Sequence, residues 1–128
     1  DARKVQQTVL LVGEVSEMYV NNFNRMMNDP NFTPRELVAI GNGYSALLNE
    51  STELLKELKQ IISSSSLSLN DKERMDVIER VYKEVKDYHS LVRYYTNKNI
   101  SVSYLRAKKK NDAKRVLDLY GTSNQKYW

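Results

Sequence analysis

Phe32-Thr33-Pro34-Arg35-Glu36-Leu37 is a nearly complete helix start within a chain of 128 residues. Thr33 suits the N-cap and Pro34 suits the first helical position, where its missing N–H costs nothing. The Thr33 hydroxyl can accept a hydrogen bond from the Glu36 amide, while the Glu36 carboxylate reaches back to the cap amide. We therefore predict that a helix begins at about residue 33.

The apolar residues that follow this start recur at helical spacing. They are Leu37, Ile40, Tyr44, Leu47, Leu54, Leu58 and Ile61. Leu37 stands where it can also pack on Phe32 across the helix start. One step of seven residues passes over Ser51, which is polar at a core position. The pattern stops at Ser63 to Ser66, so we predict a helix over 33–63 and a Ser-rich linker over 63–69.

An earlier apolar stripe predicts another helix, over about 3–28. It consists of Val5, Val9, Val12, Val15, Tyr19, Phe23 and Met26. The steps are all three or four residues, as on one face of a helix. Pro30 disfavours helix at Asp29, so we expect a turn there.

A third start signal pairs Asn70 with Glu73, and Asp71 suits the positive end of the helix dipole. The stripe that follows is Met75, Ile78, Tyr82, Val85, Tyr88, Val92 and Tyr95. We predict a helix over 70–96. The weak helix formers Asn97-Lys98-Asn99 predict a bend, with straight continuation of the helix as the alternative. A last helix over 101–120 is expected to end at Gly121.

Three long apolar stripes must be buried together, because none is stable alone in water. We predict an all-α fold, an elongated antiparallel bundle of three long helices plus a shorter C-terminal helix, in one domain over 1–128. A coiled-coil homodimer buries the same stripes in another way. Whether the last helix packs on the bundle stays open.

Composition excludes several kinds of site. The chain has no cysteine, one histidine and only four glycines, which argues against thiolate chemistry, His-based metal centres and glycine-rich phosphate loops. Lys86 stands three residues before His89, where a di-metal bundle needs a carboxylate. As the single histidine of the chain, His89 is expected to be a locally hydrogen-bonded rim residue. We predict no catalytic, cofactor-binding or metal-ligating residues, no cofactor and no enzymatic activity.

Positive charge is concentrated in the segment 106–115, although the whole chain carries only +4. Its cations are Arg106, Lys108, Lys109, Lys110, Lys114 and Arg115. Asp112 is the one acid among them. This segment is the candidate binding site for an anionic partner, which can be nucleic acid, an acidic protein or lipid headgroups. The alternative is a solvated helix face.

Tyrosine is the commonest aromatic residue, with nine copies. Tyr82, Tyr88 and Tyr95 belong to the third apolar stripe, so we expect them to pack in the core. Tyr94 lies off that stripe, so we expect it to contact another molecule.

The C-terminal third reads Tyr94-Tyr95-Thr96-Asn97-Lys98-Asn99, then a Lys-rich helix, then Arg115-Val116-Leu117-Asp118-Leu119-Tyr120-Gly121. Together with the long helices before it, this stretch resembles the small helical transfer proteins encoded by bacterial conjugative transposons. Those proteins in turn resemble exported minor-pilus components of type IV secretion. The resemblance implies export through a removed signal, an elongated helical shape and binding to other transfer components.

The sequence thus favours a non-enzymatic helical assembly or interaction protein, with a protein partner or self-association. The alternative is a nucleic-acid-binding accessory protein that uses the basic segment. Neither reading includes a transmembrane segment, because no apolar run reaches about 18 residues. The start at Asp1 fits an exported or periplasmic location if a signal was removed, and otherwise a cytoplasmic one.

Overall fold

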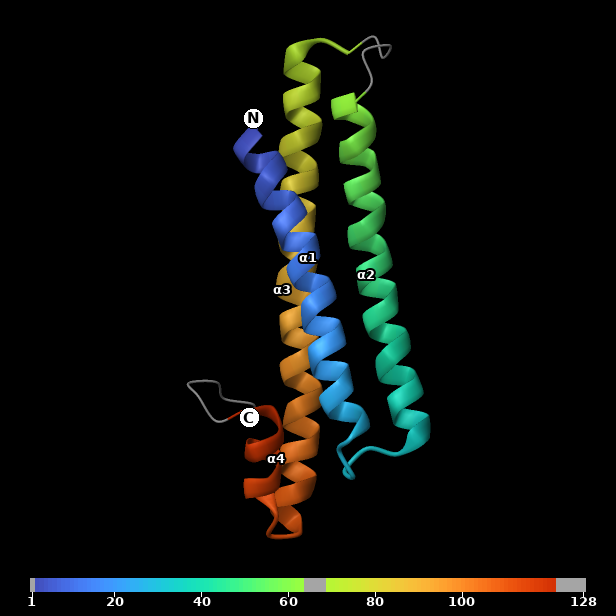
Figure 1. Cartoon of the computed structure of the whole chain (residues 1–128), viewed down its shortest axis with the longest axis vertical. Helices are drawn as coiled ribbons and strands as arrows, with labels where there is room; N and C mark the ends of the chain where they lie inside the picture. The colour runs from blue at the N-terminus through green and yellow to red at the C-terminus, as the bar shows by residue number, and fades with distance from the viewer. Residues whose placement is uncertain (1, 64–68, 122–128) are drawn as a thin grey trace.

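The computed structural model describes residues 2–63 and 69–121, which form four helices (Figure 1). They are α1 (Ala2–Met27), α2 (Pro34–Ser63), α3 (Asp71–Lys109) and α4 (Ala113–Tyr120). The long helix α2 runs antiparallel to α1 and α3, and no strand occurs among the described residues. The predicted all-α bundle of three long helices and a shorter C-terminal one is confirmed.

The start of α2 forms the predicted capping box. The Thr33 amide donates to Glu36 Oε1 at 2.9 Å, and the Glu36 amide donates to Thr33 Oγ1 at 3.2 Å. Phe32 is buried, and Leu37 packs against the same apolar cluster. Asn70 and Glu73 form the equivalent capping box at the start of α3. Local sequence therefore sets where both helices begin.

The bend predicted at Asn97-Lys98-Asn99 is wrong, because α3 runs without a break over 39 residues. Thr96 and Ile100 are buried on either side of this stretch. Asn99 Nδ2 donates to the Tyr95 carbonyl at 2.9 Å, so the side chain bonds within the helix instead of interrupting it. Tertiary packing outweighs weak helix propensity here. The alternative of a straight helix holds, and the last helix begins at residue 113 instead of 101.

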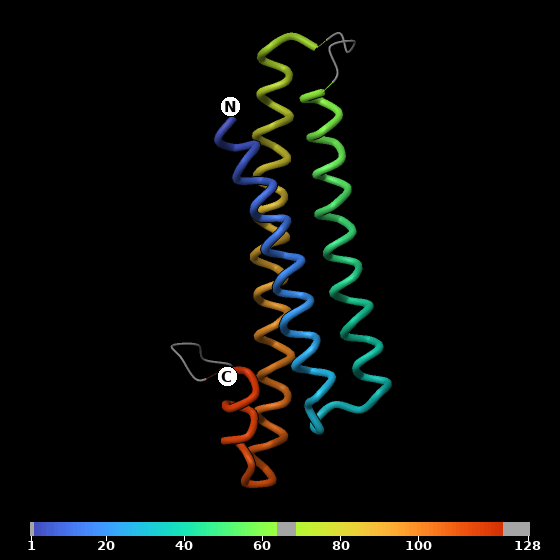
Figure 2. The backbone as a smooth tube through the Cα atoms, viewed as in Figure 1, coloured from blue at the N-terminus to red at the C-terminus, as the bar shows by residue number. Residues whose placement is uncertain are grey.

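The chain reverses after α3, and α4 lies alongside the end of that helix (Figure 2). Asn111 adopts φ 57°, a left-handed conformation that asparagine tolerates. Val116 and Tyr120 are buried, so the last helix packs on the bundle. Gly121, with φ 96°, follows α4 at the expected position.

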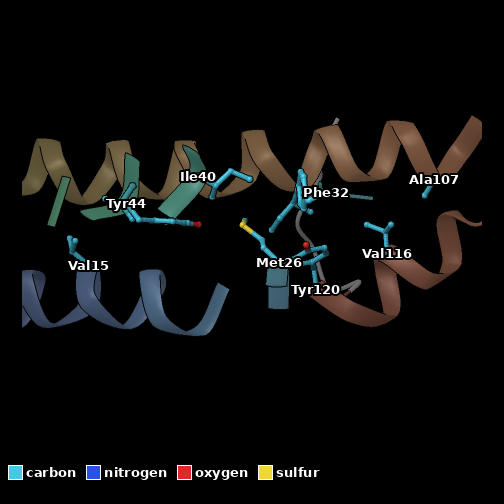
Figure 3. Packing of buried hydrophobic residues seen from close by; sticks show 10 residues of the cluster. Val15, Met26, Phe32, Ile40, Tyr44, Ala107, Val116 and Tyr120 are labelled. Carbon is cyan, nitrogen blue, oxygen red and sulfur yellow. The ribbon is translucent and has the colours of Figure 1, made fainter. Parts of the chain in front are cut away.

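The apolar core has two parts. At the α2–α3 end, the buried residues are Val12, Leu58, Ile78, Val81 and Val85. At the α3–α4 end they are Val15, Met26, Phe32, Ile40, Tyr44, Val92, Ile100, Ala107, Val116 and Tyr120 (Figure 3). Between the two parts in sequence stand His89 and Ser51, both buried. The Ser51 hydroxyl donates to the Leu47 carbonyl at 3.0 Å, which satisfies the polar residue in the stripe.

Aromatic packing distinguishes the α3–α4 end. The Tyr44 ring stacks on Tyr19 at 5.0 Å between centroids, and Tyr95 meets it edge-on at the same distance. The Tyr44 hydroxyl lies 2.6 Å from Thr96 Oγ1, and the Tyr95 hydroxyl donates to the Ile40 carbonyl at 3.0 Å. Burial raises the pKa of Tyr44 to about 12. The core tyrosines thus also cross-link helices.

Two predicted core residues are about half exposed, Val9 and Met75. Lys4, near the start of α1, pairs with Glu79. Met75 stands one turn before Glu79 and so lies beyond the part of α3 that α1 covers. Val9 lies at the edge of its stripe, on the side of α1 that faces away from α3.

Candidate interaction surfaces

The Arg106 side chain is hydrogen-bonded within the folded chain. Its guanidinium donates to both carboxylate oxygens of Glu36, at 2.9 and 2.7 Å, and to the Asn31 carbonyl at 2.7 Å. The hydrogen bond from Arg106, helped by the Thr33 amide, lowers the pKa of Glu36 to about 2. The same pairing raises the pKa of Arg106. This residue ties α3 to the start of α2, so it is a poor candidate for binding an external anion.

The other five cations of the segment gather around the α3–α4 turn. Lys108 and Lys109 are exposed in the last turn of α3, and Lys110 donates to Asn31 Oδ1 at 3.2 Å. On α4, Lys114 pairs with Asp118 at 3.4 Å, and Arg115 pairs with Asp112 at 3.7 Å. Solvent-exposed pairs of this kind are weak. We call these five residues the basic end.

Tyr94 is 62% exposed, as expected for a residue off the core stripe. Leu91 and Leu105, both about half exposed, lie on the same side of α3 by helical spacing. Lys98 lies between them on this side. We call Leu91, Tyr94, Lys98 and Leu105 the α3 outer face. From Tyr88 to Asn111 the sequence contains no acid, so this face leads into the basic end without a negative charge.

A buried carboxylate that we did not predict joins three parts of the chain. Asp29, 3% exposed in the α1–α2 turn, accepts at Oδ2 from the Ser103 hydroxyl at 2.5 Å and the Tyr120 hydroxyl at 2.6 Å. Its Oδ1 accepts from the Asn31 amide at 2.9 Å. Burial and the adjacent carboxylate raise the pKa of Tyr120. An aspartate before a proline is typical of an exposed turn, so nothing local marks it as buried.

A hollow of about 260 Å³ adjoins this carboxylate, between the α1–α2 turn and α4. Its lining includes Pro30, Val116 and Leu119 together with the charged Arg115 and Asp118. The Asp29 oxygens are already engaged by groups of the chain itself. The hollow therefore places Arg115 of the basic end beside Pro30, Val116 and Leu119, and the one buried carboxylate in its lining, Asp29, is already hydrogen-bonded.

His89 was expected to be a rim residue with a local hydrogen bond, and this expectation is wrong. It is buried, and its Nε2 lies 2.8 Å from Glu14 Oε1 on α1. The contact joins α3 to α1 between the two parts of the core. Within residues 2–63 and 69–121, no group of three His, Cys, Asp or Glu residues is placed to hold a metal ion.

No helix in the described part of the chain is both long and apolar enough to cross a membrane. In comparisons with protein-family models, with curated proteins and with solved structures, the chain has no significant match.

Proposed function

We propose that this chain is a non-enzymatic interaction protein whose α3 outer face binds an acidic protein partner. The observation that carries the proposal is the character of that face. Three large apolar side chains, Leu91, Tyr94 and Leu105, are exposed on one side of a helix segment that contains cations and no acid.

Exposed apolar groups that cluster on a soluble bundle mark interaction sites more often than isolated ones do. Tyrosine is enriched in the buried centre of protein interfaces, because its ring is large and its hydroxyl can find a partner. Lys98 lies between Tyr94 and Leu105, and Lys108 and Lys109 follow at the C-terminal end of this face. Their positive charge would attract an acidic surface and set its orientation. Apolar and ionic contacts then act on the same partner.

The resemblance to transfer proteins of conjugative transposons suggests the setting. In that setting the partner is another component of a type IV secretion-like transfer apparatus. The elongated bundle then acts as an assembly part and carries no chemistry of its own.

The test is site-specific photo-cross-linking in the cells that make the protein. A photoreactive residue at Tyr94 should capture one discrete acidic protein. The matched control is Met75, which is about half exposed on the same helix at the opposite end. With the captured protein purified, Tyr94→Ala and Lys98→Glu should each weaken binding about tenfold or more, while Met75→Ala should leave it unchanged. Equal cross-linking at both positions, or none at Tyr94, contradicts the proposal.

The basic end favours a second candidate, binding of nucleic acid. Its cations come from the end of α3, the turn and α4, and Lys114 is 89% exposed. Phosphate contacts predict that the logarithm of the affinity falls with that of salt, by about 0.9 per neutralised phosphate on duplex DNA. Fluorescence anisotropy at low and high salt measures this slope. Replacing Lys108, Lys109 and Lys110 with Glu should abolish binding, and unchanged binding in that variant rejects this candidate. Arg106 stays intact because it holds Glu36.

A further inference from the structure

One side of the α1/α2 pair carries no charge over most of its length. From Val5 to Asn24 the charged residues are Glu14 and Glu17, and from Leu37 to Thr52 the only one is Glu50. By contrast, sixteen of the 39 residues of α3 are charged. The low density of charge on α1 and α2 is unusual for a solvated surface, where Lys, Glu and Asp are common.

Ten uncharged residues share one outward side of the two helices, at steps of three, four or seven residues along each helix. They are Val9, Gly13, Ser16, Val20 and Met27 on α1, with Val38, Asn42, Ser45, Asn49 and Thr52 on α2. We call these ten residues the α1/α2 outer face. The Tyr19 hydroxyl lies 3.1 Å from Ser45 Oγ, so the two stripes flank the α1–α2 contact.

This face is turned away from α3. On α1, the side that meets α3 is marked by Glu14, which contacts His89. On α2 that side is marked by Ile40, whose carbonyl accepts from Tyr95. Neither side is shared with the stripes of the α1/α2 outer face, so α3 does not cover this face.

The face presents apolar side chains to solvent. Val9, Val20, Met27 and Val38 are between 47 and 64% exposed. A Cβ built on Gly13 would have no atom within 4 Å, so the surface there is open as well as uncharged. Glycine inside an exposed helix costs helix stability, and the structure of the single chain gives no reason for it at this position.

We infer that the α1/α2 outer face docks on the same face of a second copy of the chain, an inference that rests on the proposed interaction role. A two-fold interface must be complementary to itself. An uncharged face satisfies this condition because no like charges meet, whereas the stretch of α3 from Tyr88 to Lys109, which has cations and no acid, would bring cations against cations. The two pairs of α1 and α2 would then form a four-helix layer.

The size of the face is sufficient for a dimer. From Val9 to Met27 α1 rises about 27 Å, and from Val38 to Thr52 α2 rises about 21 Å. Two helices packed side by side are about 20 Å wide. Each copy thus contributes roughly 500 Å², and the pair reaches about 1,000 Å², the lower limit for a specific interface. The α3 outer face and the basic end stay on the outside of such a dimer, available to the other partner.

The test is sedimentation equilibrium on the full chain over a wide range of concentration. The wild type should be a dimer and Val20→Glu a monomer. Leu91→Glu is the matched control, since it puts the same charge on a similarly exposed residue of the α3 outer face, and it should remain a dimer. Circular dichroism of both variants checks that the helices are retained. Val38→Glu, on the other helix of the face, should repeat the result of Val20→Glu.

Spin labels give a second measurement, which is clean because the chain has no cysteine. Labels on Asn24→Cys, one turn from Val20 at the edge of the face, should give a shorter distance between copies than labels on Tyr94→Cys. A wild type that is monomeric throughout overturns the inference, and so does a dimer that Leu91→Glu breaks and Val20→Glu does not. A monomer to which a photoreactive residue at Val20 cross-links another protein also overturns it. None of these outcomes bears on the Tyr94 cross-link, which tests the proposed function separately.

Discussion

The two ends of the bundle are held together by different means. At the α2–α3 end, small aliphatic residues such as Val81 and Val85 fill the core, and ion pairs on the surface join Lys4 to Glu79 and Arg80 to Glu57. The α3–α4 end has an aromatic core and polar cross-links that reach between helices. Aliphatic burial tolerates substitution of similar volume, whereas a satisfied polar network depends on each partner. We therefore expect the α3–α4 end to be the more sensitive to mutation.

The largest contrast should come from truncating one core residue at each end. Tyr44→Ala removes a fully buried ring that contacts Tyr19 and Tyr95, and should cost about 4 kcal/mol of unfolding free energy. Val81→Ala at the other end removes two methyl groups and should cost about 2 kcal/mol. Urea denaturation measures both. Tyr44→Phe, which loses only the bond to Thr96, should cost about 1 kcal/mol. Equal losses for Tyr44→Ala and Val81→Ala would erase the contrast.

The next largest loss of stability should come from removing the buried carboxylate of Asp29. Asp29→Ala removes the acceptor of the Ser103 and Tyr120 hydroxyls and should cost about 3 kcal/mol, because hydrogen bonds to a charged group are strong. The effect should be local at first. Hydrogen exchange should accelerate over α4, which this acceptor ties to the bundle, and stay unchanged around Val81. Accelerated exchange at both ends would show that the two ends do not open separately.

Alanine substitutions at Gly43 and Gly13 should change the stability of the fold in opposite directions. A Cβ at Gly43 would overlap the Tyr95 hydroxyl, so Gly43→Ala should displace that ring from α2 and destabilise the fold by about 1–3 kcal/mol. A Cβ at Gly13 meets nothing within 4 Å, so Gly13→Ala should stabilise the folded chain by about 1 kcal/mol through helix propensity. Thermal unfolding of both variants gives the signs. Stabilisation by Gly43→Ala would mean that Tyr95 packs only loosely on α2.

The smallest expected effect is the loss of folding stability at acidic pH. Arg106 lowers the folded-state pKa of Glu36 from 4.5 to about 2, so the stabilisation is present above pH 4.5 and is lost as the pH falls toward 2. Lys4 also lowers the pKa of Glu79, at the other end. Between these pH values the wild type should lose more stability than Glu36→Gln does. Urea midpoints across this range measure the difference, and parallel curves for the two proteins would contradict it.

The fold was largely predictable because its signals are local. The capping boxes at Thr33 and Asn70 involve residues three positions apart, and the apolar stripes repeat every three or four residues. The error at Asn97-Lys98-Asn99 has the opposite origin. Weak propensity is also local, but burial of Ile100 depends on the helices packed around it. Sequence alone does not show which of the two is stronger.

The candidate surfaces were predictable only in part. The periodicity placed Tyr94 outside the core, and composition marked the basic segment. The ion pair of Arg106 with Glu36 joins residues 70 positions apart. The hydrogen bonds of Asp29 come from Ser103 and Tyr120, which are 74 and 91 positions away. No local pattern carries that information. The same holds for the α1/α2 outer face, which becomes a single surface only after two helices pack.

The unbroken length of α3 also gives the molecule a fixed internal scale. At about 1.5 Å per residue its 39 residues span roughly 58 Å. The helices α1, α2 and α4 all pack on α3, so α3 is the common rigid element of the bundle. In a larger assembly, α3 sets a constant spacing between whatever is bound at its two ends. A hinge at residues 97–99 would have made that spacing variable.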